Sequence, residues 1–245
     1  MMVAVVTGAA GAMGGAIAAE LGARGHALVL ADISGRRLAE AADRLTAHGR
    51  AAHPYRCDVT DRAEAEALAA AALAAFGRVD VLVNVVGGYR GRMYEDVLDI
   101  PLDRFDEAMR LNLRGTFNLT QLFGRHMRER GHGRIVNISS VAKDGASGQA
   151  DYAAAKAGVV AFTRSCALEL GPAVTVNAVA PGVIRTSVME RIPADVQARY
   201  RERIPLADFG DPVDVARAVA FLAGDDGRYV TGEVIHVSGG FFGCL

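Results

Sequence analysis

The sequence alternates between short runs of apolar, β-branched residues and longer segments rich in Ala, Leu and Glu. The apolar runs cover residues 3–7, 27–31, 79–83, 135–139, 174–180 and 234–237. The intervening segments have helical periodicity and cover residues 12–24, 35–48, 61–76, 102–130, 151–170 and 212–223. Because the runs are continuously apolar, we expect strands that are buried on both faces. The alternation predicts a doubly wound, Rossmann-like α/β fold with about seven parallel strands and helices on both faces.

The remaining strand and the domain count follow from the same pattern. Residues 51–57 (AAHPYRC) also read as a strand, although Pro54 interrupts the run. No linker, repeat or low-complexity tract divides the chain, so residues 1–245 are predicted to form one domain. Residues 1–19 carry no charge, but glycines interrupt them and a basic n-region is lacking, so we read no targeting segment.

Charge and cysteine usage restrict the partners and the compartment. The formal net charge is −1 and no run of Lys or Arg stands out, which argues against nucleic acid or an anionic membrane as a partner. Cys57, Cys166 and Cys244 are widely spaced and form no CxxC motif, so a reducing cytoplasm fits best. The six histidines show no metal-ligand spacing, and we expect no metal site.

A glycine-rich turn, TGAAGAMGG at residues 7–15, joins the first strand to the first helix. Glycines there permit a tight turn and a close approach to a pyrophosphate at the helix N-terminus. Asp32 ends the second strand, 18 residues beyond Gly14, where a carboxylate can accept hydrogen bonds from both hydroxyls of an adenosine ribose. The structural alternatives are glycines that only pack a helix on the sheet and an Asp32 that caps the next helix. Turn and acid together favour dinucleotide binding, with NAD preferred over NADP because the carboxylate repels a 2′-phosphate.

The segment YAAAK places Tyr152 and Lys156 four residues apart on one helical face, with only alanines between them. On its own this spacing is also typical of a surface helix whose lysine extends past a half-buried tyrosine.

Eight motifs occur in a fixed order along the whole chain: TGAAGAMG (7–14), CDV (57–59), LVNVVGG (82–88), LNLRG (111–115), VNISS (136–140), YAAAK (152–156), VNAVAPGVIRT (176–186) and VTGEVIHVSGG (230–240). Together they resemble the short-chain dehydrogenase/reductase superfamily. Within it they resemble the short, single-domain branch and its 3-oxoacyl-(acyl-carrier-protein) reductases. The resemblance implies a catalytic tetrad of Asn112, Ser140, Tyr152 and Lys156. Tyr152 would exchange a proton with the substrate oxygen, Lys156 would favour the phenolate, Ser140 would hold the substrate oxygen, and Asn112 would anchor a water.

The same resemblance implies the cofactor contacts. Tyr152 and Lys156 would also meet the cofactor. The other implied residues are Gly8, Gly11, Ala12, Met13 and Gly14 at the pyrophosphate, Asp32 and Ile33 at the ribose, Asp58 and Val59 at the adenine, Asn84, Val85 and Gly87 near the second ribose, and Pro181, Gly182, Ile184 and Thr186 at the carboxamide.

Three features of the sequence depart from the family pattern. Ala12 replaces the middle glycine, so the turn reads TGxxGxxG as in the longer, sugar-nucleotide branch, and we expect its Cβ to face a crowded turn. NVVGG replaces NNAG, which is expected to remove one polar link between the sheet and the cofactor side. Ser140 lies 12 positions before Tyr152, one fewer than usual; Ser139 would restore the spacing, but we prefer Ser140.

The sequence therefore predicts an NAD(H)-dependent oxidoreductase that interconverts a secondary alcohol and a ketone. The alternatives are an NADPH-dependent 3-oxoacyl or polyketide-type ketoreductase and a catalytically silent dinucleotide-binding regulator. Arg90 and Arg92, in the lengthened segment 88–103, suggest an anionic substrate; the competing prediction is a neutral pocket lined by Val86, Tyr89 and residues 187–205. The resemblance also implies a homotetramer, or at least a dimer, in which segments 102–130 and 151–170 pair between subunits. The apolar C-terminal FFGCL is expected to be buried in this or a neighbouring subunit.

Overall fold

The computed structural model describes residues 1–89, 91, 94–187, 189 and 192–241. Its centre is a seven-stranded, wholly parallel sheet in the order β3-β2-β1-β4-β5-β6-β7. The strands are β1 (Val3–Thr7), β2 (Ala27–Asp32), β3 (Ala52–Arg56), β4 (Val81–Asn84), β5 (Gly133–Ile138), β6 (Val174–Pro181) and β7 (Val234–Val237). The predicted doubly wound fold is confirmed.

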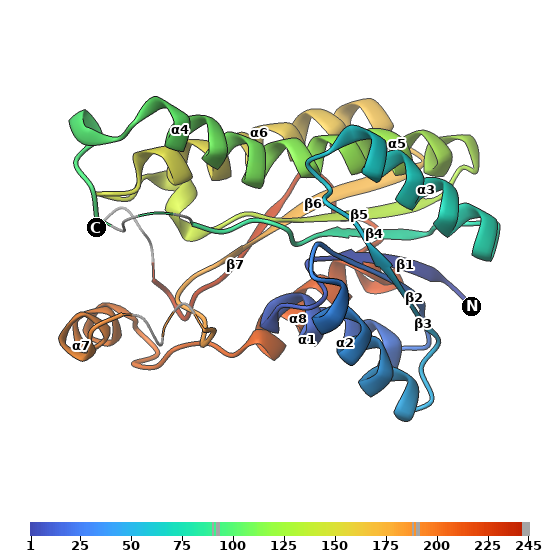
Figure 1. Ribbon diagram of the computed structural model, residues 1–245, viewed down its shortest axis with the longest axis horizontal. Coiled ribbons are helices and arrows are strands. Elements are labelled where there is room, and N and C mark those ends of the chain that lie inside the picture. The colour runs from blue at the N-terminus through green and yellow to red at the C-terminus, as the bar shows by residue number, and fades with distance from the viewer. Residues whose placement is uncertain (90, 92–93, 188, 190–191, 242–245) are drawn as a thin grey trace.

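Helices cover both faces of the sheet (Figure 1). They are α1 (Ala12–Ala23), α2 (Gly35–Ala47), α3 (Arg62–Phe76), α4 (Leu102–Met109), α5 (Gly115–Glu129), α6 (Ala150–Leu170), α7 (Ala194–Arg203) and α8 (Pro212–Ala223). In Figure 1, α3 to α6 lie above the sheet, and α1, α2 and α8 lie below it. Each face therefore has its own buried apolar layer, which is why the strands are apolar on both sides.

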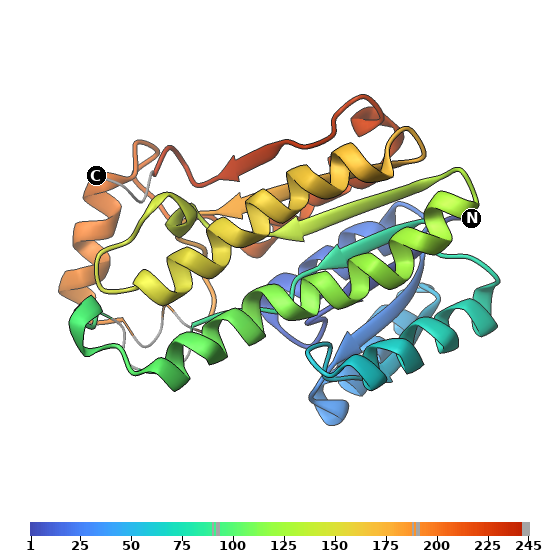
Figure 2. The same cartoon turned by 90° about the horizontal axis from the view of Figure 1, so that it is seen from above.

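The structure differs from the predicted elements at two helices. The predicted helix 102–130 is divided by a π-helical turn, Arg110–Arg114, although α4, the turn and α5 still run as one nearly continuous rod above the sheet (Figure 2). The helix α7 lies in a segment for which the apolar pattern predicted nothing. None of its ten residues is fully buried, and two apolar side chains that pack against the core, Val196 and Tyr200, are too few for a periodicity search to detect.

The edge position of β3 explains how its proline is tolerated. Among the described strands β3 pairs only with β2, and Pro54 lies opposite Leu30 in that ladder. A residue without an N–H is acceptable at an edge because its outer side has no strand to bond.

The turn after β4 is tied to β1, at the point where the sheet order reverses direction. The Thr7 hydroxyl accepts hydrogen bonds from the backbone N–H groups of Val85 (2.9 Å) and Val86 (3.2 Å). The carboxyl ends of β1 and β4 are thereby held together at the edge where doubly wound sheets bind ligands.

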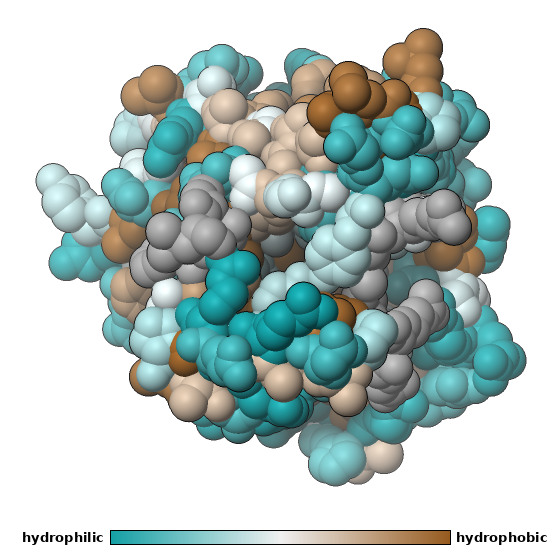
Figure 3. Space-filling view, turned by 90° about the vertical axis from the view of Figure 1, so that its left-hand side faces the viewer, coloured by the Kyte–Doolittle hydropathy of each residue, from teal (hydrophilic) through white to brown (hydrophobic). Residues whose placement is uncertain are grey.

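At the same end of the molecule, a small apolar cluster joins the C-terminal segment to the loop after β5. Phe241 is buried against Val141 and Ile204 in this cluster. Figure 3 looks onto this end, where hydrophilic groups cover most of the face and a hydrophobic group lies at its upper edge. The expected burial of the tail thus holds for Phe241, while residues 242–245, including Cys244, lie outside the described residues.

Two further observations concern the helices and the cysteines. No helix among the described residues is long and apolar enough to cross a membrane. Cys57 and Cys166 are buried free thiols, and burial raises the pKa of Cys57 to about 12 and that of Cys166 to about 11. Both sulfurs therefore remain protonated and unreactive at neutral pH.

Candidate active site

The predicted Tyr152–Lys156 pair lies in the first turns of α6. Lys156 is 2% exposed, and its Nζ donates a 2.8 Å hydrogen bond to the Ile138 carbonyl at the end of β5. Two of the intervening alanines, Ala153 and Ala155, are buried. Small side chains thus let α6 approach the sheet closely enough for the lysine to reach the strand end.

Burial opposes ionisation of both groups. It raises the pKa of the Tyr152 phenol, and a hydrogen bond with Ser140 acts in the opposite direction. Burial also lowers the pKa of Lys156 to about 8. The ammonium is retained at neutral pH, but by a much smaller margin than in water.

Ser140, and not Ser139, is the serine that contacts the phenol. Ser139 is 2% exposed, and its hydroxyl donates a 2.9 Å hydrogen bond to the Lys156 carbonyl within α6. Ser140 is half-buried, hydrogen-bonds Tyr152 and accepts a 3.2 Å bond from the Ala142 N–H. Successive residues at the end of a strand point to opposite sides, so only one of the two hydroxyls can face the site.

Asn112 occupies the middle of the π-helical turn and is 1% exposed. Its Oδ1 accepts from the Gly88 N–H (2.8 Å), and its Nδ2 donates to the carbonyls of Gly88 and Ala108 (3.0 Å each). A Cβ added at Gly87 would lie 2.7 Å from Oδ1 of Asn112 and 2.9 Å from Nζ of Lys156. Asn112 and Lys156 therefore both border Gly87, which brings the fourth predicted catalytic residue beside the lysine.

The glycine turn leaves no room for a side chain at its contact with α1. A Cβ at Gly14 would lie 2.2 Å from the carbonyl oxygen of Gly8, whose own φ is +61°. The Gly8 carbonyl also accepts the Gly11 N–H at 3.0 Å. Ala12 is exposed, so the expectation that its Cβ faces a crowded turn is wrong: the crowded position is Gly14, because the helix turns Ala12 outward. Met13, the remaining predicted turn residue, is half-buried.

Asp32 links the glycine turn to the start of α2. Its Oδ2 accepts from the Ala10 N–H (3.1 Å), and its Oδ1 accepts from the Ser34 N–H (2.9 Å). Ser34, not Asp32, is the N-cap residue of α2. Each carboxylate oxygen keeps a lone pair, and Asp32 is 8% exposed while the neighbouring Ile33 is 54% exposed. The end of β2 therefore places acceptor atoms just beneath the surface.

The residues predicted to lie near the nicotinamide are found where β4 and β6 end. The Asn84 side chain points into the sheet, where its Nδ2 donates to Asn137 Oδ1 (2.8 Å) and to Thr120 (3.3 Å). Its polar links therefore join β4 to neighbouring elements, and the backbone of the following residues, Val85 to Gly87, forms the open edge. Pro181 ends β6, and a Cβ at Gly182 would lie 2.5 Å from that of Ser238.

The other two residues predicted to contact the carboxamide, Ile184 and Thr186, lie shortly after Gly182 in the sequence. Ile184 is 6% exposed and bridges to Gly210, and Thr186 is half-buried.

A charged cluster beside Tyr152 was not predicted from the sequence. The Arg104 side chain, 12% exposed, pairs with the buried Asp151 (2.9 Å) and with Glu95, and it donates to the Tyr89 hydroxyl. The Tyr89 ring lies edge-on to that of Tyr152, with 5.9 Å between centroids. A 270 Å³ cavity adjoins these side chains. Arg104 lies on α4, which reads as a surface helix in the sequence, so its place in this cluster is recognised only from its contacts in the folded chain. The arginines that the sequence did suggest, Arg90 and Arg92, lie outside the described residues.

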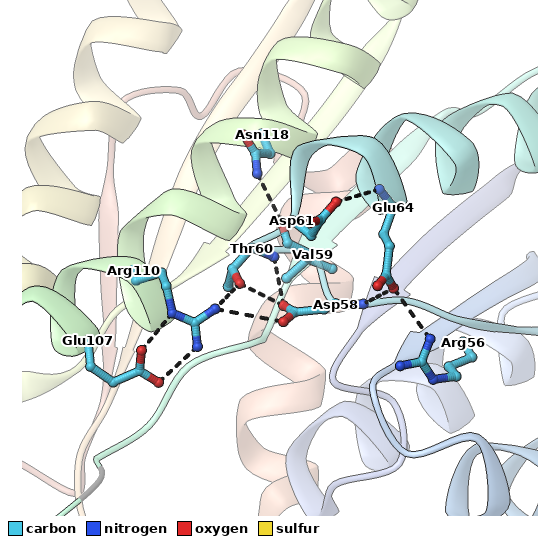
Figure 4. Close-up of polar contacts among 9 residues, drawn as sticks. All are labelled: Arg56, Asp58, Val59, Thr60, Asp61, Glu64, Glu107, Arg110 and Asn118. Atoms are coloured by element: carbon cyan, nitrogen blue, oxygen red, sulfur yellow. Dashed lines mark hydrogen bonds and ion pairs between the residues drawn. The ribbon is translucent and has the colours of Figure 1, made fainter.

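The predicted adenine-side residues, Asp58 and Val59, lie in the segment between β3 and α3 (Figure 4). Asp58 Oδ1 accepts from the N–H (2.9 Å) and the hydroxyl (2.7 Å) of Thr60. The carbonyl of the buried Val59 accepts from Nδ2 of Asn118 at 3.0 Å. The segment is thus held in one conformation by its own side chains and by α5.

The chain is similar to known proteins in both sequence and structure. A family model described as enoyl-(acyl carrier protein) reductase matches residues 8–242. The chain is 39% identical over 239 residues to (2S)-((R)-hydroxy(phenyl)methyl)succinyl-CoA dehydrogenase subunit BbsD of Thauera aromatica, covering 97% of this chain and 95% of that protein. It is 38% identical over 240 residues to 3-oxoacyl-(acyl-carrier-protein) reductase FabG of Thermotoga maritima, covering 97% and 96%. A solved 7α-hydroxysteroid dehydrogenase, complexed with NADH and 7-oxo glycochenodeoxycholic acid, superposes with a TM-score of 0.93 at 32% identity, over 100% of this chain and 95% of that one.

Proposed function

The chain belongs to the short-chain dehydrogenase/reductase superfamily, and from that premise we propose that it is an NAD(H)-dependent oxidoreductase that interconverts a secondary alcohol and a ketone. The observation that carries the proposal is the convergence of Ser140, Tyr152 and Lys156, with Asn112 bordering the same glycine as the lysine. These four side chains come from the loop after β5, from α6 and from the π-helical turn, at the carboxyl edge of the sheet.

The roles follow from the hydrogen-bonding capacities of the groups. In the oxidising direction Tyr152 takes the proton of the substrate hydroxyl, and Ser140 donates a hydrogen bond to the same oxygen. The charge of Lys156 stabilises the phenolate, offsetting the burial that raises the pKa of Tyr152. Asn112, with its amide bound to Gly88 and Ala108, fixes the wall beside the lysine. A bound nicotinamide dinucleotide supplies the hydride acceptor or donor.

The residues present fit such a dinucleotide. The absence of a side chain at Gly14 lets the start of α1 pack directly on the Gly8 backbone, which fixes the shape of the turn that a pyrophosphate would approach. A side chain at Gly87 would collide with Asn112 and Lys156, so this glycine preserves space beside the catalytic groups. Asp32 supports NAD, because its carboxylate offers acceptors to ribose hydroxyls and repels a 2′-phosphate. NAD in turn favours oxidation in the cell.

A second candidate is the NADPH-dependent reduction of a 3-oxoacyl thioester. It is favoured by the relative from Thermotoga maritima, whose name describes a 3-oxoacyl-(acyl-carrier-protein) reductase. Both candidates use the same tetrad and differ in cofactor and in substrate.

Residues 1–245 are proposed to act as one domain that assembles into a homotetramer or a dimer. The support is the outer face of α5 and α6, where the rings of Phe117 and Phe162 lie 5.8 Å apart beside a groove of 840 Å³. Phe117 is 45% exposed, an unusual position for a large aromatic side chain unless a partner covers it. A monomer measured by light scattering at micromolar concentration would contradict the assembly.

The function is tested by mixing the purified protein with NAD or NADP and a panel of secondary alcohols that includes 3-hydroxyacyl thioesters. Formation of reduced nicotinamide is followed by absorbance, with Tyr152→Phe as the matched control. Turnover with NAD that the control lacks supports the proposal, whereas a clear preference for NADP and thioesters selects the second candidate. Dinucleotide binding without turnover of any alcohol or ketone would instead indicate a silent regulator.

A further inference from the structure

The π-helical turn between α4 and α5 contacts both ends of the proposed dinucleotide site. Its first residue, Arg110, reaches the adenine-side segment 58–60, while Asn112, two residues later, binds Gly88 on the nicotinamide side. A single turn of helix therefore connects two loops that follow different strands, β3 and β4.

The Arg110 guanidinium is held in a fixed orientation. Its Nε and Nη2 donate to the two carboxylate oxygens of Glu107 at 2.6 Å and 2.9 Å, a bidentate arrangement (Figure 4). This hydrogen bonding raises the pKa of Arg110 above its ordinary value, so the charge is permanent. The remaining nitrogen, Nη1, donates to the Thr60 hydroxyl and lies 3.7 Å from Oδ2 of Asp58.

Thr60 transmits this orientation to Asp58. Its hydroxyl accepts from Arg110 and donates to Asp58 Oδ1 at 2.7 Å, so both of these interactions run through one oxygen. Thr60 is 5% exposed, which leaves the hydroxyl little opportunity to bond water instead. The position of the Asp58 carboxylate is therefore tied to that of Arg110.

The same rod of helix also fixes Val59. A Cβ added at Gly115 would lie 2.7 Å from Cγ2 of Val59, and Asn118 binds the Val59 carbonyl. The helical rod thus contacts the segment 58–60 at three points, through Arg110, Gly115 and Asn118. Asn112, which borders Lys156, lies between Arg110 and Gly115 in the sequence.

We infer that Arg110 is a positioning residue that sets the adenine-side wall of the site relative to Asn112 and the catalytic lysine. The inference rests on the proposed function, because it assumes that a dinucleotide spans both loops. Without the guanidinium, the carboxylates of Asp58 and Glu107 would lose a shared cation. A small displacement of one wall then misplaces a cofactor that is bound at both ends, which affects binding and turnover together.

The central experiment compares Arg110→Met and Thr60→Val with the wild type. Thr60→Val keeps the shape of the side chain and removes only the hydroxyl, so folding is expected to survive. For both variants we expect KM for NAD to rise about tenfold and kcat to fall about tenfold, and calorimetry should show weaker binding of AMP. Arg110→Lys should restore part of each loss, because an ammonium can still donate to Thr60 but cannot bind Glu107 bidentately.

Two control variants separate positioning from other effects. Arg114→Met removes an exposed arginine that, like Arg110, lines the groove on the outer face of α5 and α6. A contribution of subunit assembly to the kinetics should therefore appear in this variant as well. Thr60→Ser keeps the hydroxyl and should behave like the wild type. Thermal unfolding of all variants reports loss of stability.

Four outcomes are decisive. Values of kcat, KM and AMP affinity within twofold of the wild type for Arg110→Met and Thr60→Val would overturn the inference, as would a lowered Tm with unchanged kinetics. Equal losses in Arg114→Met would attribute the effect to assembly and also overturn it. Failure of the wild type itself to bind NAD would instead refute the proposed function, so the two failures are distinguishable.

Discussion

The side-chain nitrogen of Lys156 lies over the ring of Tyr152, 5.8 Å from its centroid. This distance is within the range in which an ammonium is attracted to the face of an aromatic ring. The lysine is also anchored to the end of β5, so the tyrosine has a cation at a fixed position beside it. In this geometry the ammonium lies close enough to stabilise a phenolate at Tyr152.

The first prediction concerns that phenol. Tyr152→Phe keeps the ring packed against Tyr89 and removes the group that exchanges the proton. Turnover should fall by about 10²–10⁴-fold, the usual contribution of a general acid or base. Binding of NAD, measured by calorimetry, should stay within a few-fold of the wild type. A variant that turns over at nearly the normal rate would show that another group carries the proton.

The second prediction concerns the stability cost of the buried Lys156. Because its pKa is lowered from 10.5 to about 8, the unfolded chain binds more protons than the folded protein between these two values. The buried lysine therefore makes the free energy of unfolding increase with pH from about 8 to 10.5. Burial of the ammonium lowers that free energy by about 3 kcal/mol, and this cost is fully present below pH 8.

Lys156→Met, which cannot titrate, provides the comparison. Denaturant unfolding without added dinucleotide should show that the variant's stability relative to the wild type is greatest at pH 7 and declines as the pH rises towards 10. A difference that does not change with pH would mean that the lysine keeps its ordinary pKa.

The third prediction separates the two serines. Ser140→Ala removes the hydroxyl that contacts Tyr152 and should reduce kcat severely. Ser139→Ala removes a buried hydrogen bond to α6 and should lower stability by about 1 kcal/mol, with a smaller effect on kcat. Parallel measurement of kcat and of urea unfolding tests both halves, and the opposite ranking would assign the catalytic role to Ser139.

The fourth prediction uses two neighbouring glycines of α1. A Cβ at Gly14 overlaps the Gly8 carbonyl, so Gly14→Ala must displace the turn, at a cost of about 1–3 kcal/mol, and should weaken NAD binding. At Gly15 the nearest atom to an added Cβ is the Ala9 carbonyl at 3.5 Å, an ordinary contact, so Gly15→Ala should bind NAD normally. Equal binding by both variants in calorimetry would remove the turn from the dinucleotide site.

The fifth prediction concerns cofactor choice at Asp32. Asp32→Ala should reduce the ratio of kcat/KM for NAD over NADP by about tenfold, since it removes charged acceptors and the repulsion of a 2′-phosphate. The substitution also frees the N–H groups of Ala10 and Ser34, but that effect is shared by both cofactors and cancels in the ratio. A wild-type enzyme with equal efficiency for both cofactors would refute the role of Asp32.

Local sequence patterns were sufficient for much of this protein. The strands and most helices begin and end within a few residues of the predictions, because burial on both faces leaves continuous apolar runs and amphipathic packing leaves a helical period. The spacing of Tyr152 and Lys156 likewise fixes a shared helical face, whatever surrounds it. The prediction that Ser140 faces the site also agrees with the contact to Tyr152, although its catalytic role stays a prediction.

Other features depend on where distant segments meet, and the tertiary structure alone decided them. Arg110 and Thr60 are 50 positions apart, and Arg104 and Asp151 are 47 apart, so no periodic pattern records either contact. Ala12 reads as a crowded position from the motif, but the direction of α1 exposes it and brings Gly14 against Gly8. The sequence by itself determined the order of elements and the spacing of the catalytic groups, since both are encoded by neighbours along the chain. Which side chains support those groups was decided only by folding, because such contacts depend on the path of the backbone between them.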